Sequence, residues 1–190
     1  MRKTILLLLA AFMLVSCNNG KNVTIFEIGD SREDVINTMV NDFTIQGKHW
    51  SRAEITNEMH YDSKKLRTWI TLYECVYKGQ EYYKVRVYFD LSSKVCRMEL
   101  KIAQDQMKNM HKRLKSKYGE SRRANLPKGF FGTYEISTVY LGDIDAIIVT
   151  EDNQDLIRTH SDGTTTEENK DTYELIVVSG DQYYELKRYL

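Results

Sequence analysis

Trp69-Ile-Thr-Leu-Tyr-Glu-Cys-Val-Tyr77 opens a run of three strand-like segments that ends at Ile102. The second segment is Tyr83-Lys-Val-Arg-Val-Tyr-Phe-Asp-Leu91, and the third is Val95-Cys-Arg-Met-Glu-Leu-Lys-Ile102. All three are rich in β-branched and aromatic residues and alternate with a period of two, which is typical of strands. Short turns separate them, Lys78-Gly79-Gln80-Glu81 and Ser92-Ser93. We therefore predict an antiparallel meander from Trp69 to Ile102.

Pairing the strands across these turns places one apolar set on a common face: Ile70, Leu72, Val76, Val85, Val87, Phe89, Cys96, Met98, Leu100 and Ile102. A slip of one residue would turn every side chain of a strand to the other face, so agreement among three strands supports this assignment. In this register Cys75 points away from the core and Cys96 points into it, about 18 Å away. A disulfide allows about 7 Å between Cα atoms, so we expect no bond between them.

The opposite face of the meander collects aromatic and basic side chains. The candidate binding residues there are Trp69, Tyr73, Tyr77, Lys84, Arg86, Tyr88 and Arg97. Aromatic rings beside cations can stack on and hydrogen-bond a ligand or a protein partner. The same side chains also suit ordinary cross-strand pairs, or a second core packed beneath other elements. The sequence leaves these interpretations open.

Two amphipathic helices flank the meander. Ser31, followed by acidic residues and an apolar i, i+4 pattern, predicts a helix over residues 31–41. Met107, Met110 and Leu114 predict a second helix from Gln104 to Tyr118, with its apolar stripe on the apolar face of the sheet.

The remainder of the chain resembles a looser copy of the first half. We expect strands at residues 133–141, 144–150 and 172–178, and a long acidic loop over residues 151–171. At the end, a short helix capped by Asp181 competes with a strand over residues 182–186. The predicted fold class is α+β, an antiparallel sheet with two or three amphipathic helices packed on one face, with two α-βββ units as one such arrangement.

The first seventeen residues combine a basic start, an apolar run of about a dozen residues and Leu14-Val15-Ser16-Cys17. The run is shorter than the roughly twenty residues that span a bilayer, and it suits a signal peptide. Its end resembles the lipobox of bacterial lipoproteins, which implies cleavage before Cys17 and lipid on Cys17. We therefore expect a signal peptide over residues 1–16, a lipidated tether over 17–24 and a single domain over 25–190. The protein would be anchored to the inner or outer membrane, with its body in the periplasm or at the cell surface.

Charge and motif content narrow the function. Removal of Arg2 and Lys3 leaves 25 of the 27 basic residues against 27 acidic ones, so no global field favours nucleic acid. The four histidines lack zinc-site spacing, and the chain has no nucleophile elbow and no phosphate-binding glycine loop. The acidic segment 151–171 could offer oxygen ligands to calcium but lacks the EF-hand order. We predict no metal and no cofactor and lean against an enzyme, although catalytic groups can meet from distant positions.

The helix start Ile28-Gly-Asp-Ser-Arg-Glu-Asp-Val35, followed by a meander, resembles the SmpA/OmlA type of small envelope lipoprotein and the similarly folded β-lactamase-inhibitor proteins. This resemblance implies a binding or assembly role, with an envelope protein as partner. Our first hypothesis is therefore an anchored binding lipoprotein that acts through the aromatic and basic face. A periplasmic small-molecule or inhibitor-like module would require a concave aromatic pocket. An enzyme, the third hypothesis, would require a cluster of side chains with perturbed pKa values in one cleft.

Overall fold

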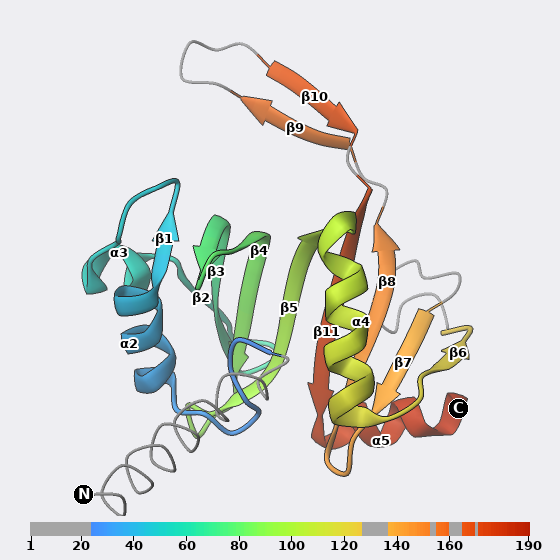
Figure 1. Cartoon of the computed structure of the whole chain (residues 1–190). Coiled ribbons are helices and arrows are strands. Elements are labelled where there is room, and N and C mark those ends of the chain that lie inside the picture. Colours follow the sequence, from blue (N-terminus) through green and yellow to red (C-terminus); the bar gives the residue numbers. More distant parts are fainter. Residues whose placement is uncertain (1–23, 127–136, 153–154, 160–164, 170) are drawn as a thin grey trace, which may run out of the picture.

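The computed structural model describes residues 24–126, 137–152, 155–159, 165–169 and 171–190, so Cys17 and the predicted signal peptide lie outside the described residues. Nine strands form one antiparallel sheet in the order β1-β3-β4-β5-β11-β8-β7-β6, and β2 also pairs with β3 (Figure 1). The strands are β1 Phe43–Ile45, β2 Met59–Asp62, β3 Arg67–Tyr77, β4 Gln80–Phe89, β5 Val95–Ala103, β6 Arg122–Ala124, β7 Ser137–Leu141, β8 Asp145–Asp152 and β11 Thr172–Ser179. The predicted α+β class with a large antiparallel sheet is confirmed.

Helices join the strands at four places in the described chain: α2 Arg32–Asp42, α3 Arg52–Asn57, α4 Gln104–Tyr118 and α5 Gly180–Leu186, which runs into a 3-10 turn at Lys187–Tyr189. The two predicted amphipathic helices are present. The side chain of Ser31 caps α2 by accepting a hydrogen bond from the Asp34 amide, as expected of an N-cap serine. None of the described helices has the length and apolar character needed to cross a membrane.

The first hairpin of the meander has a tighter turn than predicted. Lys78 and Gly79 alone connect β3 to β4, with φ angles of 49° and 78°, and Tyr77 pairs with Gln80. Positive φ at both central residues is typical of a two-residue hairpin turn, because its twist matches that of the strands. The strand pairing is therefore shifted by two residues from the predicted register, and Cys75 faces Tyr82 instead of Lys84. A shift of two residues preserves the faces.

The prediction was wrong for the last part of β3. Glu74 has a φ of 50°, and this left-handed residue reverses the alternation beyond it. Cys75 therefore lies in the core at 1% exposure, whereas the sequence pattern predicted it on the opposite face. Tyr77, a predicted binding residue, also lies on the core side, with its ring 4.9 Å from that of Phe43. Val76, predicted in the core, is half-buried.

The prediction that Cys96 points into the core was also wrong, because of a second irregularity. The register between β4 and β5 shifts after Tyr88, so that Phe89 pairs with Val95. Val95 then occupies the core, and Cys96 lies half-buried at the bulge, where its thiol donates to the Tyr88 carbonyl oxygen at 3.5 Å. Cys75 and Cys96 are free thiols on strands separated by β4.

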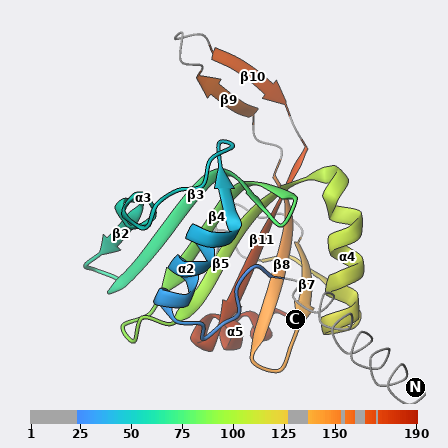
Figure 2. The ribbon, with the colours of Figure 1, turned by 60° about the vertical axis from the view of Figure 1, so that its left-hand side comes forward.

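Two hydrophobic cores lie on opposite faces of the sheet. The first contains residues of α2 and α4, such as Met39 and Leu114, together with Leu175 and Val177 of β11. The second contains Tyr183 and Leu186 of α5 together with the alternate β11 residues, Ile176 and Val178. Successive strand residues point to opposite faces, so the two cores are separated by the sheet. We call the α2 and α4 side the inner face and the α5 side the outer face (Figures 1 and 2).

The second half of the chain agrees with the prediction at β8 and β11, and at β7 for residues 137–141, since residues 133–136 of that predicted strand lie outside the described residues. It differs between β8 and β11. Residues 151–171 were predicted as a loop, but β8 continues to Asp152 and a hairpin follows, β9 Asp155–Thr159 paired with β10 Thr165–Asn169. This hairpin extends beyond the ends of β8 and β11, away from the main sheet (Figure 1). The C-terminal segment is helical, and its N-cap is Ser179 where the sequence suggested Asp181.

Candidate functional site

Three rows of paired side chains cross the outer face from β2 to β11. The first row is His60, Trp69, Tyr88 and Arg97; the second is Thr71, Arg86, Glu99 and Ile176; the third is Tyr73, Lys84, Lys101 and Glu174. Six of the seven predicted binding residues belong to these rows, and Tyr77 does not. Directly opposed residues in an antiparallel pair are close enough to interact.

The first row is a continuous stack. The His60 and Trp69 rings lie 5.5 Å apart and nearly parallel, and the Tyr88 ring is 5.9 Å from that of Trp69. The Arg97 guanidinium lies 5.4 Å from the centre of the Tyr88 ring, within the range of a cation–π contact. Stacked neighbours restrict the rotamers of Trp69 and Tyr88, so these rings form a pre-organised surface.

Glu99 is the centre of the second row. Its Oε1 accepts hydrogen bonds from Tyr88 Oη at 2.9 Å and Arg97 Nη2 at 2.8 Å, and its Oε2 lies 3.4 Å from both Lys84 Nζ and Arg86 Nη1. Lys84 also donates to Glu174 at 2.6 Å, and Arg86 Nε donates to Thr71 Oγ1 at 2.9 Å. These long side chains enclose the carboxylate, and Glu99 is 6% exposed.

The network is charged at neutral pH. Burial by itself would raise the pKa of Glu99, but Arg97, Lys84 and the Tyr88 hydrogen bond outweigh it and lower that pKa. Burial would likewise lower the pKa of Lys84, but Glu174 and Glu99 raise it. Each ion is thus stabilised in its charged form by a neighbour of opposite sign.

A cavity of about 340 Å³ opens beside this network. We call it the basic cavity, and its lining residues are Asp62, Lys65, Arg67, Trp69, Arg86, Tyr88, Arg97 and Gln182. Four of these are cationic, and Asp62 Oδ1 already accepts hydrogen bonds from the amides of Lys64 and Lys65, at 2.9 and 3.2 Å. A concave site that gathers charges of one sign concentrates ligands of the other sign.

The sequence prediction missed half of this cavity. Asp62 ends β2, Lys65 lies in the β2–β3 turn and Arg67 begins β3, all within a segment of no clear periodicity. Gln182 comes from α5. The basic residues just before Trp69 in Lys64-Lys65-Leu66-Arg67-Thr68-Trp69 are the signal that could have located the turn.

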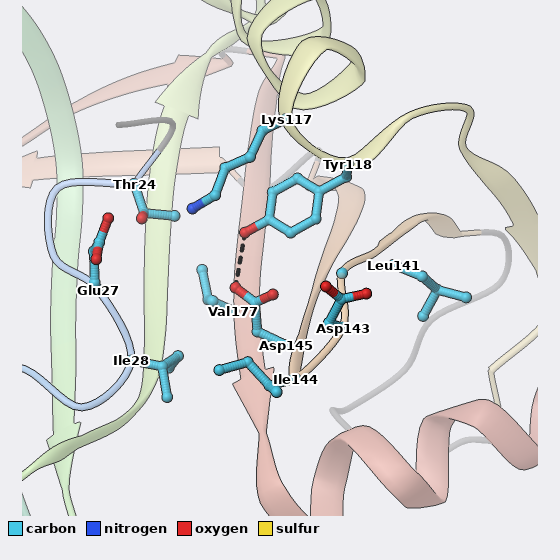
Figure 3. Close-up of a pocket in the computed structure, with 11 residues that line it drawn as sticks. Thr24, Glu27, Ile28, Lys117, Tyr118, Leu141, Asp143, Ile144, Asp145 and Val177 are labelled. Carbon is cyan, nitrogen blue, oxygen red and sulfur yellow. Dashed lines mark hydrogen bonds between the residues drawn. The ribbon is translucent and has the colours of Figure 1, made fainter. Parts of the chain in front are cut away.

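A second cavity, of about 470 Å³, lies between residues 24–28, the end of α4 and the β7–β8 turn (Figure 3). Tyr118 Oη donates to Asp145 Oδ2 at 2.8 Å, and burial together with this bond raises the pKa of Tyr118. A Cβ atom at Gly142 would lie 2.3 Å from Asp145 Oδ1, so a larger residue there would displace the Asp145 side chain. These contacts hold the turn against α4, and the charges that line this cavity are mixed, Lys117 with Glu27, Asp143 and Asp145 (Figure 3).

In the described part of the chain, no three His, Cys, Asp or Glu side chains gather around one point, so no set of metal ligands is present there. His111 contacts Tyr140, with Nδ1 and Oη 2.7 Å apart, and burial lowers its pKa. The basic cavity and the three rows beside it are therefore the candidate functional site.

Comparison of this chain with known protein families, with characterised proteins and with solved structures finds no significant match.

Proposed function

We propose that this chain is an envelope lipoprotein, anchored through lipid on Cys17, that binds a partner through the aromatic and basic outer face. The observation that carries the proposal is the meeting of Trp69 and Tyr88 with four cationic side chains in one cavity on that face. Trp, Tyr and Arg contribute most to recognition energy when they lie together in a desolvated patch. An acidic surface of another envelope protein is the partner that suits these charges.

The proposed anchor places the folded body close to a membrane. A single acyl chain binds a bilayer only marginally, whereas the several chains of a bacterial lipoprotein hold it firmly. Residues 17–24 would form a short polar tether, so the folded body would remain near the membrane surface. Cys17→Ala should release the protein from the membrane pellet or leave it unprocessed, and unchanged fractionation and mass would contradict the anchor.

A second candidate is a periplasmic small-molecule module, and the concavity of the site favours it. That function requires an aromatic pocket, and the basic cavity has about 340 Å³ with Trp69 and Tyr88 in its lining. Ligand pockets commonly measure about 300–1,000 Å³, so this cavity would suit a small ligand.

We also propose an architecture for the fold, two α-βββ units joined edge to edge. In its support, α2 precedes the β3-β4-β5 meander, α4 precedes β7, β8 and β11, and β5 pairs with β11 in the centre of the sheet. This arrangement would leave the outer face of the first unit available for binding.

Affinity capture from envelope membranes tests the binding role. The lipidated parent protein is compared with Trp69→Ala/Arg86→Ala, which removes one ring and one cation from the cavity. The matched control is Tyr184→Ala/Lys112→Ala, which removes an exposed ring on α5 and an exposed cation on α4. We expect the cavity variant to lose partners that the control retains, with all three proteins folded by near-ultraviolet circular dichroism. A folded cavity variant that captures every partner of the parent would refute the proposal.

A further inference from the structure

We infer that the basic cavity binds a phosphate monoester carried on a small organic group. The inference rests on the second candidate function, the small-molecule module, and names the chemistry of its ligand. Charge balance, the geometry of the arginines and the shape of the cavity lead to it.

Charge balance selects a doubly charged anion. The four cations of the cavity, Lys65, Arg67, Arg86 and Arg97, face two carboxylates, Asp62 in the lining and Glu99 beneath it. Asp62 lies opposite Arg67 in the β2–β3 pairing, and Glu99 also receives Lys84 and Tyr88. The formal charge of these four cations and two carboxylates is therefore +2, which suits a doubly charged ligand. A phosphate monoester carries about −1.5 to −2 at neutral pH, whereas a carboxylate or a phosphodiester carries one negative charge.

The arginines suit phosphate by their geometry. Arg67 starts β3 and Arg97 lies on β5, so the two guanidinium groups reach the cavity from strands separated by β4. A planar guanidinium donates in a fork that matches two oxygens of a phosphate. Arg86 and Arg97 are held by Glu99, at 3.4 and 2.8 Å, so they lose little freedom when a ligand binds.

The cavity also has room for more than the phosphate group. Trp69, stacked between His60 and Tyr88, supplies a rigid apolar wall, and Gln182 of α5 supplies an uncharged amide. An apolar wall with a few polar groups is the usual lining of a small-molecule site. The organic part of the ligand therefore lies against Trp69, with the Gln182 amide beside it.

Tryptophan fluorescence tests the inference. The chain has two tryptophans, so Trp50→Phe makes Trp69 the sole reporter at the cavity wall. The full lipidated protein is reconstituted in phosphatidylcholine vesicles and titrated with glycerol 3-phosphate. We expect a saturable change, at least tenfold weaker binding for Arg67→Gln, and binding within twofold of the parent for the matched control Lys112→Gln on α4.

Further arms identify the source and the charge of the ligand. Dimethyl phosphate, a monoanion, should bind at least tenfold more weakly than glycerol 3-phosphate. A response to phosphatidic acid in the vesicles, without a response to glycerol 3-phosphate, would assign the same chemistry to a lipid headgroup. The inference is overturned if neither phosphate source changes the fluorescence, if dimethyl phosphate binds equally well, or if Arg67→Gln binds like the parent. If Trp69→Ala/Arg86→Ala nevertheless loses partner capture, the proposed binding role of the outer face stands and only the phosphate ligand is rejected.

Discussion

The two halves of the outer face belong to one continuous sheet and are stabilised in different ways. Over β7, β8 and the Ile176–Val178 end of β11 the face carries an apolar core, and Tyr183 and Leu186 of α5 cover it. Over β3, β4 and β5 it carries the aromatic stack and the ions around Glu99. The border runs between two paired strands, where Arg97 lies opposite Val178 and Glu99 lies opposite Ile176.

The half beneath α5, which we call the covered half, is packed as a core. The half over β3, β4 and β5, which we call the open half, is the one that we propose for binding. Burial of apolar area contributes about 25 cal/mol per Å², so the half beneath α5 is expected to dominate stability. A partly buried ion network contributes less on balance, because desolvation of each ion opposes the attraction between them. Its charges remain oriented toward the basic cavity, which is useful for recognition.

The largest expected effect comes from opening the covered half. Tyr183 is 1% exposed, and its hydroxyl donates to the Gly142 carbonyl oxygen at 2.8 Å. Tyr183→Ala would leave a large cavity under α5 and remove this bond, so we expect a loss of about 3–5 kcal/mol in the free energy of unfolding. Urea denaturation followed by circular dichroism measures it. A loss below about 1 kcal/mol would show that α5 contributes little to the fold.

A smaller loss is expected from the centre of the open half. Glu99→Ala would leave Lys84, Arg86 and Arg97 without the carboxylate that they share. Removing one partner of a buried ion pair costs about 3–5 kcal/mol, and the partial exposure of these three cations reduces our expectation to about 2–3 kcal/mol. The same denaturation experiment applies. If Glu99→Ala destabilises more than Tyr183→Ala, the assignment of stability to the covered half is wrong.

The stabilisation supplied by the open half should also depend on pH, whereas that supplied by the covered half should not. The folded-state pKa of Glu99 lies below its ordinary value of 4.5, so the stabilisation is complete above that value and is lost as the pH falls through the lower folded-state pKa. Glu99→Gln should therefore be less stable than the parent at pH 7, and this difference should shrink as the pH falls below 4.5. Melting temperatures at pH 7, 5, 4 and 3 test it, with Tyr183→Ala as the variant whose deficit should persist.

The smallest effect is expected at the edge of the open half. Tyr73 begins the third row and is 55% exposed. Because its truncation removes little buried area, Tyr73→Ala should change the free energy of unfolding by at most about 0.5 kcal/mol. A much larger loss by urea denaturation would mean that the open half is a packed core, and the comparison between the halves would fail.

Local patterns in the sequence predicted much of the fold. Alternation placed Trp69, Tyr73 and Arg86 on the face opposite Ile70 and Val87, and the structure agrees. Ser31 and the spacing of Met107, Met110 and Leu114 located α2 and α4. The capping box of α3, Ser51 with Glu54, was also readable from the sequence but was missed within a segment of mixed composition.

The errors occurred where one residue breaks a local rule. Glu74 and Cys96 lie at irregularities of their strands. Glu74 reverses the alternation of the residues that follow it, and the bulge at Cys96 brings the preceding residue, Val95, into the core. Neither Glu74 nor Cys96 is the glycine that marks some bulges, so alternation alone could not locate these irregularities. Tyr77 was assigned to the binding face for this reason.

By itself, the sequence determined the class of the fold, the polarity of the strand faces between irregularities and the presence of aromatic and basic residues on one face, because the period of a strand is set by neighbouring residues along the chain. The basic cavity was decided by the tertiary structure. Arg67 and Arg97 meet through the β3-β4-β5 register, and Gln182 joins them because β11 pairs with β5 and α5 follows β11. Such meetings depend on long-range pairing and on the docking of a helix, and no spacing along the chain encodes them.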